Sequence, residues 1–364
     1  MSAAGALSVG VVRETRPAER RVALVPKMAA RLIEHGLRVV IESGAGEQAA
    51  FYDDAFTAVG ATVGDAWGCD VVAKVAPPTA EETARLDNGT LLVSFLAPLT
   101  DPDGIAALRD AGITALAMES VPRITRAQAM DALSSQSSIA GYRATLLAAQ
   151  RLPRFLPMLT TAAGTVPPAK VLVLGAGVAG LQALATAKRL GSRPTGYDVR
   201  PEVADQVRSV GAQWLDLRVE AVGEGGYARE LTAAEHAEQQ HRLTRAITGF
   251  DVVITTALVP GRPAPKLVTA EAVEGMPAGS VIVDLAGESG GNCELTEPFD
   301  ETVAHGTRIC SPENLAADMP GHASELYARN ITELIELCVD DDGSLALDFA
   351  DEIIASACVA GGKS

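Results

Sequence analysis

Two patterns of hydrophobic and polar positions alternate along the first third of the chain. Short apolar runs are typical of buried strands, and apolar residues three or four positions apart are typical of helices. The strands predicted in this region are Ser8–Val12, Arg38–Glu42, Val71–Val75, Thr90–Leu96 and Thr114–Met118. The helices predicted between them are Lys27–His35, Asp53–Val59, Thr79–Leu86 and Asp101–Ala111. Such alternation predicts parallel strands joined by right-handed crossovers.

The segment from Ile124 to Arg151 has no strand pattern. Its apolar and small residues recur at steps of three and four, at Met130, Leu133, Ser137, Ala140, Ala144 and Leu147. This spacing marks one face of a long helix, which we expect to connect two domains. Four prolines then interrupt the pattern, at Pro153, Pro157, Pro167 and Pro168.

Regular alternation resumes after these prolines. The further predicted strands are Val171–Leu174, Pro194–Asp198, Gln213–Leu215, Asp251–Thr255 and Ser280–Asp284. The further predicted helices follow Gly180 and cover Glu202–Val210, Thr232–Ile247 and Ala323–Cys338. Residues 218–231 are polar and rich in glycine, which predicts a mobile loop that could act as a lid.

The fold class predicted from these patterns is α/β, with two Rossmann-like domains that contain parallel sheets and are joined by a long helix. We expect the first domain to be discontinuous, made of residues 1–125 with 326–364, and completed by the C-terminal helix. The second domain covers residues 126–325 and includes the connector helix 125–151 and the mobile loop at about 218–231.

A glycine-rich turn, Gly175-Ala-Gly177-Val-Ala-Gly180, joins a predicted strand to a predicted helix. Gly175 permits the turn, Gly177 permits close approach of a pyrophosphate, and Gly180 permits close packing of helix on strand. The N–H groups of the first helical turn, at Val178 and Ala179, then face the phosphates. The context of a strand before and a helix after makes this a dinucleotide-binding signature.

The next strand ends at Asp198, about twenty residues after the glycine turn. A carboxylate at this distance accepts hydrogen bonds from a ribose 2′-hydroxyl, so Asp198 favours NAD over NADP. Arg200 leaves an alternative open, because an arginine at this position can hold a 2′-phosphate. A second glycine-rich turn at Gly44 is interpreted as a plain turn, since Glu47 places a carboxylate where a phosphate would bind.

Composition and charge narrow the function further. The chain has 364 residues, and its net charge of −16 argues against nucleic acid as a partner and against direct binding to an anionic membrane. No apolar run approaches the roughly 20 residues of a spanning helix, so direct membrane insertion is not expected. The five cysteines are scattered without CxxC spacing, which favours a reduced, cytoplasmic compartment.

The residues that could perform chemistry are polar side chains near the connector helix. The five histidines show no metal-binding spacing, so no metal site is predicted. Gln128, Asp131 and Ser134 are three residues apart and would share a helix face, with Arg123 in the preceding loop. Capping of the helix on a solvated surface is the alternative interpretation of these residues.

Several motifs resemble the NAD(H)-binding component of proton-translocating NAD(P) transhydrogenase, domain I of its alpha subunit. The resemblance covers Val9 to about Leu337. It rests on the residues 122–143, on Gly175–Gly180, on Tyr197-Asp-Val-Arg200, on Gly226-Tyr-Ala-Arg-Glu230, on Ile254-Thr-Thr-Ala-Leu-Val-Pro-Gly261, on Val283-Asp-Leu-Ala286 and on Gly290-Gly-Asn-Cys-Glu294.

The resemblance implies roles for individual residues. Asp131 and Ser134 would orient the nicotinamide carboxamide, and Arg123 would steady that end of the nucleotide. Gln128 would reach NADP(H) on a partner subunit, and Tyr227 would lie on the loop that closes over NAD(H). The nucleotide contacts implied by the matched motifs are Gly175, Gly177, Val178, Ala179, Gly180, Asp198, Val199, Arg200, Thr255, Ala257 and Leu258.

The same motifs resemble alanine dehydrogenase, with one chemical difference. Alanine dehydrogenases have a catalytic histidine in a Phe-Leu-His context, whereas this chain has Phe95-Leu96-Ala97. Oxidation of an amino acid requires such an acid/base group, but hydride transfer between two nicotinamides does not. Arg21 and Lys74 match the positions that hold the substrate carboxylate in that relative, and are interpreted as relics or structural ion-pair partners.

The resemblance also implies partners and a place in the cell. The chain would act as a homodimer, on the cytoplasmic face of a membrane, with a membrane-spanning proton-channel subunit and an NADP(H)-binding subunit. It would transfer hydride directly between its own NAD(H) and the partner's NADP(H). The alternatives are a soluble NAD-dependent enzyme like alanine dehydrogenase, and a regulatory subunit that binds NADH without hydride exchange.

Overall fold

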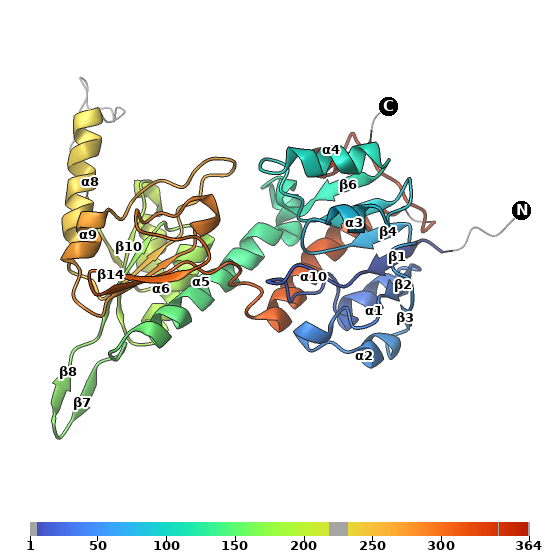
Figure 1. Ribbon diagram of the computed structural model, residues 1–364. Coiled ribbons are helices and arrows are strands. Elements are labelled where there is room, and N and C mark those ends of the chain that lie inside the picture. Colours follow the sequence, from blue (N-terminus) through green and yellow to red (C-terminus); the bar gives the residue numbers. More distant parts are fainter. Residues whose placement is uncertain (1–5, 218–231, 341, 363–364) are drawn as a thin grey trace, which may run out of the picture. The chain divides into compact units, whose positions relative to one another are not determined.

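The computed structural model describes residues 6–217, 232–340 and 342–362. The chain forms two compact units, each a sheet covered by helices on both faces (Figure 1). The first unit contains residues 1–136 and 316–364, and the second contains residues 137–315.

Within the described residues, the first unit has a seven-stranded sheet with the order β16-β6-β5-β4-β1-β2-β3. All neighbouring strands are parallel except the edge strand β16, which pairs antiparallel with β6. The strands are β1 Ser8–Val11, β2 Arg38–Ile41, β3 Thr62–Val63, β4 Val71–Ala73, β5 Leu91–Ser94, β6 Thr114–Ala117 and β16 Cys358–Ala360. The sequence predicted the parallel strands except the short β3, and it did not predict β16.

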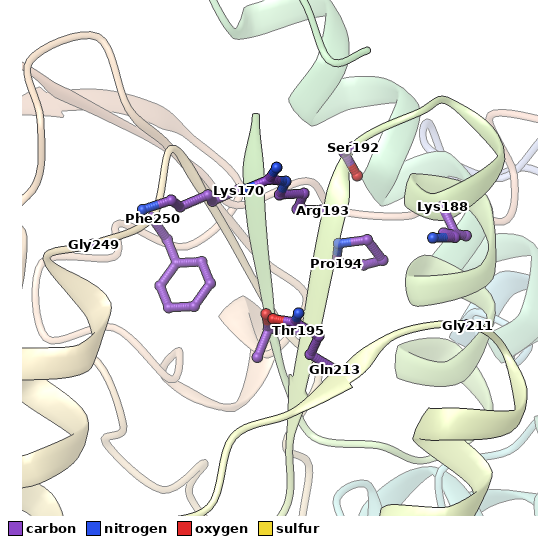
Figure 2. A pocket seen from close by; sticks show the side chains of 10 residues that line it. All are labelled: Lys170, Lys188, Ser192, Arg193, Pro194, Thr195, Gly211, Gln213, Gly249 and Phe250. Carbon is purple, nitrogen blue, oxygen red and sulfur yellow. The ribbon is translucent and has the colours of Figure 1, made fainter. Parts of the chain in front are cut away.

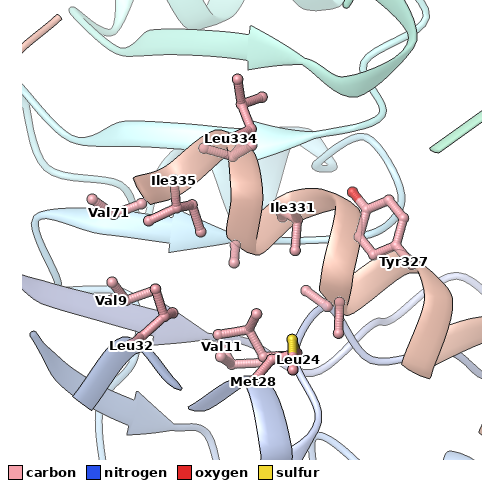
Figure 3. Packing of buried hydrophobic residues seen from close by; sticks show 14 of the residues in the cluster. Val9, Val11, Leu24, Met28, Leu32, Val71, Tyr327, Ile331, Leu334 and Ile335 are labelled. Carbon is pink, nitrogen blue, oxygen red and sulfur yellow. The ribbon is translucent and has the colours of Figure 1, made fainter. Parts of the chain in front are cut away.

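Helices cover both faces of this sheet. They are α1 Pro26–Glu34, α2 Asp53–Thr57, α3 Ala80–Thr83, α4 Pro102–Asp110, α10 Pro320–Leu337 and α11 Glu352–Ala357, with the 3-10 turns η1 Glu47–Ala49, η2 Met118–Ser120 and η3 Thr125–Met130. Figure 3 shows how α1 and α10 pack on β1 and β4, with Leu32 and Ile331 among the buried side chains. On the other face Leu108 of α4 packs with Val72 and Leu92. The C-terminal helix α10 therefore completes the core of this unit.

The sequence placed the boundaries of this unit about ten residues away, at 125 and 326. Residues 126–136 and 316–325 belong to it in the structure because they pack on its own elements. The side-chain amide of Asn330 in α10 donates to the carbonyl of Ala129 over 2.7 Å, and the hydroxyl of Ser135 donates to Asn330 over 2.7 Å. Such bonds connect segments about two hundred residues apart, which no local pattern reveals.

The second unit also has a seven-stranded sheet among its described residues, in the order β11-β10-β9-β12-β13-β15-β14. Its strands are parallel except for β14, which pairs antiparallel with β15. They are β9 Lys170–Leu174, β10 Arg193–Tyr197, β11 Gln213–Trp214, β12 Val252–Thr255, β13 Val281–Asp284, β14 Glu301–Ala304 and β15 Thr307–Cys310. Chain order reverses between β9 and β12, and ligands of such sheets bind at the carboxyl ends of the strands at this point.

The helices of the second unit are α6 Val178–Arg189, α7 Ala204–Ser209, α8 Ala233–Ile247 and α9 Ala270–Gly275, with the turns η4 Pro201–Val203 and η5 Gly287–Ser289. Helices α6 and α7 contribute to the core on one face, and α8 and α9 to the core on the other. A hairpin of β7 Leu159–Thr161 and β8 Gly164–Val166 projects from this unit (Figure 1). The sequence predicted only a break at this hairpin.

The long helix predicted at 124–151 is two elements. η3 ends at Met130, Asp131 adopts a non-helical conformation, and α5 runs from Ala132 to Arg151. Helix α5 begins in the first unit and continues in the second. Within the second unit it approaches α6 closely, because a Cβ atom on Gly141 would lie 2.0 Å from the carbonyl oxygen of Ala179.

Candidate functional site

The glycine turn after β9 has the geometry that its sequence predicts. Gly175 has a φ of 98°, in the left-handed region where a Cβ atom is disfavoured, and its N–H donates to the carbonyl of Tyr197 over 2.8 Å. A Cβ atom on Gly180 would lie 1.8 Å from the carbonyl oxygen of Gly175. Glycine at these two positions is therefore required for α6 to start directly beside the end of β9.

The N-terminus of α6 is open to a ligand. Its cap residue is Gly177, no side chain caps it, and no acidic residue lies in its first turn. Gly177 and Val178 are exposed, and a Cβ atom built on Gly177 meets nothing within 4 Å. The backbone N–H groups of Val178 and Ala179 are therefore available for an anion, which the helix dipole also favours.

Asp198 lies beside this turn at the end of β10. Its Oδ2 accepts a hydrogen bond from the N–H of Ala176 over 2.8 Å, and its Oδ1 accepts one from the N–H of Arg200 over 2.9 Å. Burial acts to raise the pKa of this carboxyl, but hydrogen bonds from Arg200 and Ala176 outweigh it, and the pKa is lowered. Asp198 is therefore an ionised acceptor at the position predicted for a ribose hydroxyl.

The guanidinium of Arg200 forms an ion pair with Asp198. Its Nε lies 3.1 Å from Oδ1 and its Nη2 lies 3.2 Å from Oδ2, while half of the side chain stays exposed. This pairing reduces the positive charge that a 2′-phosphate would need.

The loop after β12 forms the other side of the turn. The hydroxyl of Thr256 donates to the carbonyl of Gly175 over 3.0 Å. Thr255, by contrast, is fully buried, and its hydroxyl donates to Asp284 over 2.8 Å. Of the contacts implied by resemblance, Thr255 therefore orients the loop from below, whereas Ala257 and Leu258 reach the surface.

Two residues that sequence reasoning did not assign to the site hold this loop in place. Asn292 is fully buried, and its side-chain amide donates to the carbonyl of Ala257 over 2.8 Å while its oxygen accepts from the Ala257 N–H over 3.0 Å. The buried Asp284 accepts bonds from Thr255, Cys293 and Thr296. The motifs that contain Asp284 and Asn292 were recognised, but only as matching segments.

Apolar side chains are exposed around these turns. Val178, Val199 and Leu258 are 43%, 70% and 54% exposed, and they follow β9, β10 and β12, which are neighbours in the sheet. Large apolar side chains beside an anion site are typical of pockets for planar ligands. The carboxyl edge of this sheet thus combines an anion site, an ionised carboxylate and apolar surface.

The remaining predicted site residues belong to the first unit. Asp131 caps α5, since its Oδ1 accepts from the N–H of Ser134 over 2.8 Å and its Oδ2 accepts from the Ser134 hydroxyl over 2.6 Å. The capping interpretation of this pair therefore holds structurally, and it fixes both side chains. Arg123 and Gln128 are exposed. Tyr227 and the loop predicted at 218–231 lie outside the described residues.

A buried cluster of charges lies at the carboxyl ends of β1 and β4, where chain order reverses in the first sheet. Lys74 is 1% exposed, and its Nζ lies 3.1 Å from Glu14 and 3.4 Å from Glu82. Burial raises the pKa of Glu14, which the charge of Lys74 opposes. Arg21 pairs with Glu19 over 2.6 Å and donates to Gln136 over 2.9 Å. Arg21 and Lys74 are therefore ion-pair partners of this chain's own carboxylates.

Ala97 occupies a turn with little room for chemistry. Its φ of 52° is left-handed, and its N–H donates to the carboxylate of Glu119, as does the N–H of Leu96. No imidazole is present at this position of the turn. Among the described residues, no group of three or more His, Cys, Asp or Glu side chains could hold a metal ion, and no helix is long and apolar enough to cross a membrane.

The chain matches two family domains that together cover most of its length. Residues 10–140 match the N-terminal domain of alanine dehydrogenase/PNT, and residues 144–363 match the C-terminal domain of alanine dehydrogenase/PNT.

Similar proteins include the first segment of a divided NAD(P) transhydrogenase subunit alpha from Rhodospirillum rubrum, which is 44% identical over 97% of this chain and 96% of that protein. NAD(P) transhydrogenase subunit alpha from Haemophilus influenzae is 41% identical over 96% of this chain and 70% of that protein. A solved transhydrogenase from Sinorhizobium meliloti superposes with a TM-score of 0.89, at 42% identity, over 98% of this chain and 99% of that one. L-Alanine dehydrogenase has a TM-score of 0.81 at 28% identity, over 97% of this chain and 94% of that one.

Proposed function

The chain belongs to the alanine dehydrogenase/PNT family, and from this premise we propose that it is the NAD(H)-binding subunit of a proton-translocating transhydrogenase. It binds NAD(H) itself and exchanges hydride directly with NADP(H) on a partner subunit. The observation that carries the proposal is the open N-terminus of α6 beside the ionised Asp198.

The residues of the second unit fit a dinucleotide with a free ribose 2′-hydroxyl. The N–H groups of Val178 and Ala179 bind the pyrophosphate, and Gly177 leaves it space. Asp198 accepts hydrogen bonds from the ribose. A 2′-phosphate beside this carboxylate would be repelled, and Arg200 is already paired with it. The site therefore selects NAD(H) over NADP(H).

We assign the nicotinamide end to residues of the first unit, on the basis of the family motif. Asp131 and Ser134 hold the carboxamide, and their mutual hydrogen bond over 2.6 Å sets the direction of both side chains. Arg123 steadies the same end, and Gln128 contacts NADP(H) of the partner. When bound, the nicotinamide supplies the carbon that accepts or gives the hydride.

Ala97 offers no group for a coupled proton transfer, because its side chain is not titratable. The cations that could hold a substrate carboxylate are neutralised by internal carboxylates, Lys74 by Glu14 and Arg21 by Glu19. Hydride transfer between two nicotinamides needs proximity and exclusion of water but no general acid. Alanine at position 97 thus fits transhydrogenation better than amino-acid oxidation.

The subunit works in a complex. A membrane-spanning proton-channel subunit and an NADP(H)-binding subunit are the partners, and they hold this chain peripherally on the cytoplasmic face of the membrane.

A second copy of the chain completes a homodimer. The hairpin β7–β8 supports this, because isolated two-stranded hairpins are marginally stable and all of its strand residues are exposed. Its apolar neighbours Phe155 and Met158 are 54% and 63% exposed, which is typical of a surface that another chain covers.

Reconstitution tests the function directly. The purified chain, mixed with the NADP(H)-binding subunit, is expected to catalyse hydride exchange between NADH and an oxidised NADP analogue. The chain alone should bind NADH and exchange no hydride. If the mixture shows no exchange although both proteins bind their nucleotides, the proposed function is wrong.

The alternative is an NAD-dependent oxidoreductase like alanine dehydrogenase. The retention of Arg21 and Lys74 and the similar fold of L-alanine dehydrogenase favour it. An assay of the isolated chain with NAD and L-alanine separates the two functions. Sustained NADH production without any partner would support the alternative and exclude transhydrogenation as the sole activity.

A further inference from the structure

A cavity opens at the amino ends of β9 and β10, at the opposite end of these strands from the glycine turn. Its volume is about 740 Å³, and it is lined among others by Lys170, Lys188, Arg193, Thr195, Gln213 and Phe250. Figure 2 shows Lys170 and Arg193 on adjacent strands, with Lys188 on the neighbouring helix α6. A five-residue strand is roughly 16 Å long, so this cavity is distinct from the candidate dinucleotide site.

Two of these cations are direct neighbours in the sheet. Arg193 and Lys170 are register partners in the parallel ladder of β10 and β9, and both are exposed. Like charges placed opposite each other on adjacent strands are destabilising. In a chain with a net charge of −16, such a pair is not explained by a general excess of positive charge.

Carboxylates of the described residues do not form salt bridges with these cations. Asp251 lies at the same edge, where it accepts a hydrogen bond from the backbone N–H of Lys170 over 2.8 Å. Its carboxylate also forms an ion pair with Arg154, which already offsets its charge. Of the described residues that line the cavity, none is acidic.

Lys188 has a partial explanation in its helix. It lies in the last turn of α6, where a positive charge complements the helix dipole. Its aliphatic stem runs along Gly211, since a Cβ atom on that glycine would lie 3.4 Å from Cε of Lys188. Lys170 and Arg193 lie in strands, where no helix dipole accounts for them.

We propose that this cavity binds a phosphorylated small molecule of mononucleotide size. Its three cations are suited to phosphate oxygens, and its volume falls in the range of roughly 300–1,000 Å³ that holds small organic ligands. Phe250 offers an aromatic face at the wall, on which a planar base can stack. Thr195 and Gln213 add neutral hydrogen-bonding groups.

Calorimetric titration of the full chain with AMP and with pyrophosphate, in saturating NADH, tests the proposal. Both ligands should bind, and AMP should bind more tightly because it also contacts Phe250. The double variant Lys170→Gln/Arg193→Gln should weaken AMP binding about 100-fold, roughly tenfold for each charge-assisted contact. Arg189→Gln, which removes a charge from the same turn of α6 outside the cavity lining, should change it less than about twofold.

Three results would overturn the proposal. They are an absence of binding by either ligand, loss of AMP binding when NADH is added, and unchanged AMP affinity in the double variant. Binding of pyrophosphate alone would refute a mononucleotide ligand. As an independent check, the double variant without ligand should unfold at higher urea concentration than the wild type at low salt, because the repulsion between Lys170 and Arg193 is gone.

Discussion

The backbone N–H of Ala176 donates a hydrogen bond to Oδ2 of Asp198 over 2.8 Å. This contact fixes the carboxylate at the end of β10 to the glycine turn at the end of β9. The proposed pyrophosphate and ribose contacts are thereby set relative to each other before any nucleotide binds.

Replacement of Asp198 by alanine should weaken NADH binding. The variant loses charge-assisted hydrogen bonds to the ribose, worth about 1–3 kcal/mol, or roughly 5- to 150-fold in Kd. Calorimetric titration with NADH measures the change. Arg200→Ala serves as the control, because it removes the ion pair but leaves the carboxylate; an equal loss in both variants would mean that the ion pair, not the ribose contact, matters.

The two glycines of the turn should separate stability from binding. Gly180→Ala forces a Cβ atom against the carbonyl of Gly175 and should lower the free energy of unfolding by about 1–3 kcal/mol. Gly177→Ala meets no atom in the protein, so its free energy of unfolding should change by less than about 0.5 kcal/mol. NADH affinity should nevertheless fall in Gly177→Ala, because the methyl group occupies the approach of the pyrophosphate.

Urea denaturation and NADH titration of both glycine variants check this prediction. Normal NADH affinity in Gly177→Ala would place the pyrophosphate elsewhere.

Gln128→Asn should affect hydride exchange without affecting NADH binding. The shortened side chain keeps its amide but withdraws it from the partner's nucleotide. NADH affinity of the isolated chain is expected to stay within about twofold of the wild type, while exchange in the reconstituted complex slows by roughly tenfold or more, since small misplacements are costly. A variant that loses NADH affinity would instead assign Gln128 to this chain's own nucleotide.

The ionised state of Asp198 should appear in the pH dependence of stability. Its pKa is lowered from the ordinary 3.8, because the hydrogen bonds from Arg200 and Ala176 outweigh the effect of burial. A lowered pKa stabilises the fold above pH 3.8, and this contribution is lost as the pH falls through the folded-state pKa. The difference in unfolding free energy between wild type and Asp198→Asn should be constant above about pH 5 and shrink below 3.8. A difference independent of pH would contradict it.

The thiols should differ in reactivity. Burial raises the pKa of Cys293 to about 11 and those of Cys310 and Cys338 to about 12, and Cys69 is also buried. Cys358 is partly exposed. Because the thiolate is the reactive form, one thiol should react rapidly with a disulfide reagent at about pH 8 in the native protein, and all five after denaturation. Loss of the rapid phase in Cys358→Ser identifies it, and persistence of that phase would refute the assignment.

Local sequence patterns were sufficient for much of this structure. The apolar run before Gly175, the helix after Gly180 and the acid at Asp198 predicted a strand, a turn and a helix that the structure contains, because each depends on contacts between near neighbours in sequence. The parallel strands β1, β4 and β5 followed for the same reason, since strands buried on both faces are continuously apolar.

Tertiary structure alone decided the rest. The antiparallel edge strands β14 and β16 and the hairpin β7–β8 have no strong apolar pattern, because edges and hairpins are only partly buried. The break at Asp131 depends on the cap that it forms with Ser134, and a helical period continues through it regardless. The pairing of Lys74 with Glu14, sixty residues apart, and the buried bonds of Asn292 to Ala257 require the chain to fold first. Sequence thus determined which chemical groups are available, and packing between distant segments determined which of them are neutralised and which face a ligand.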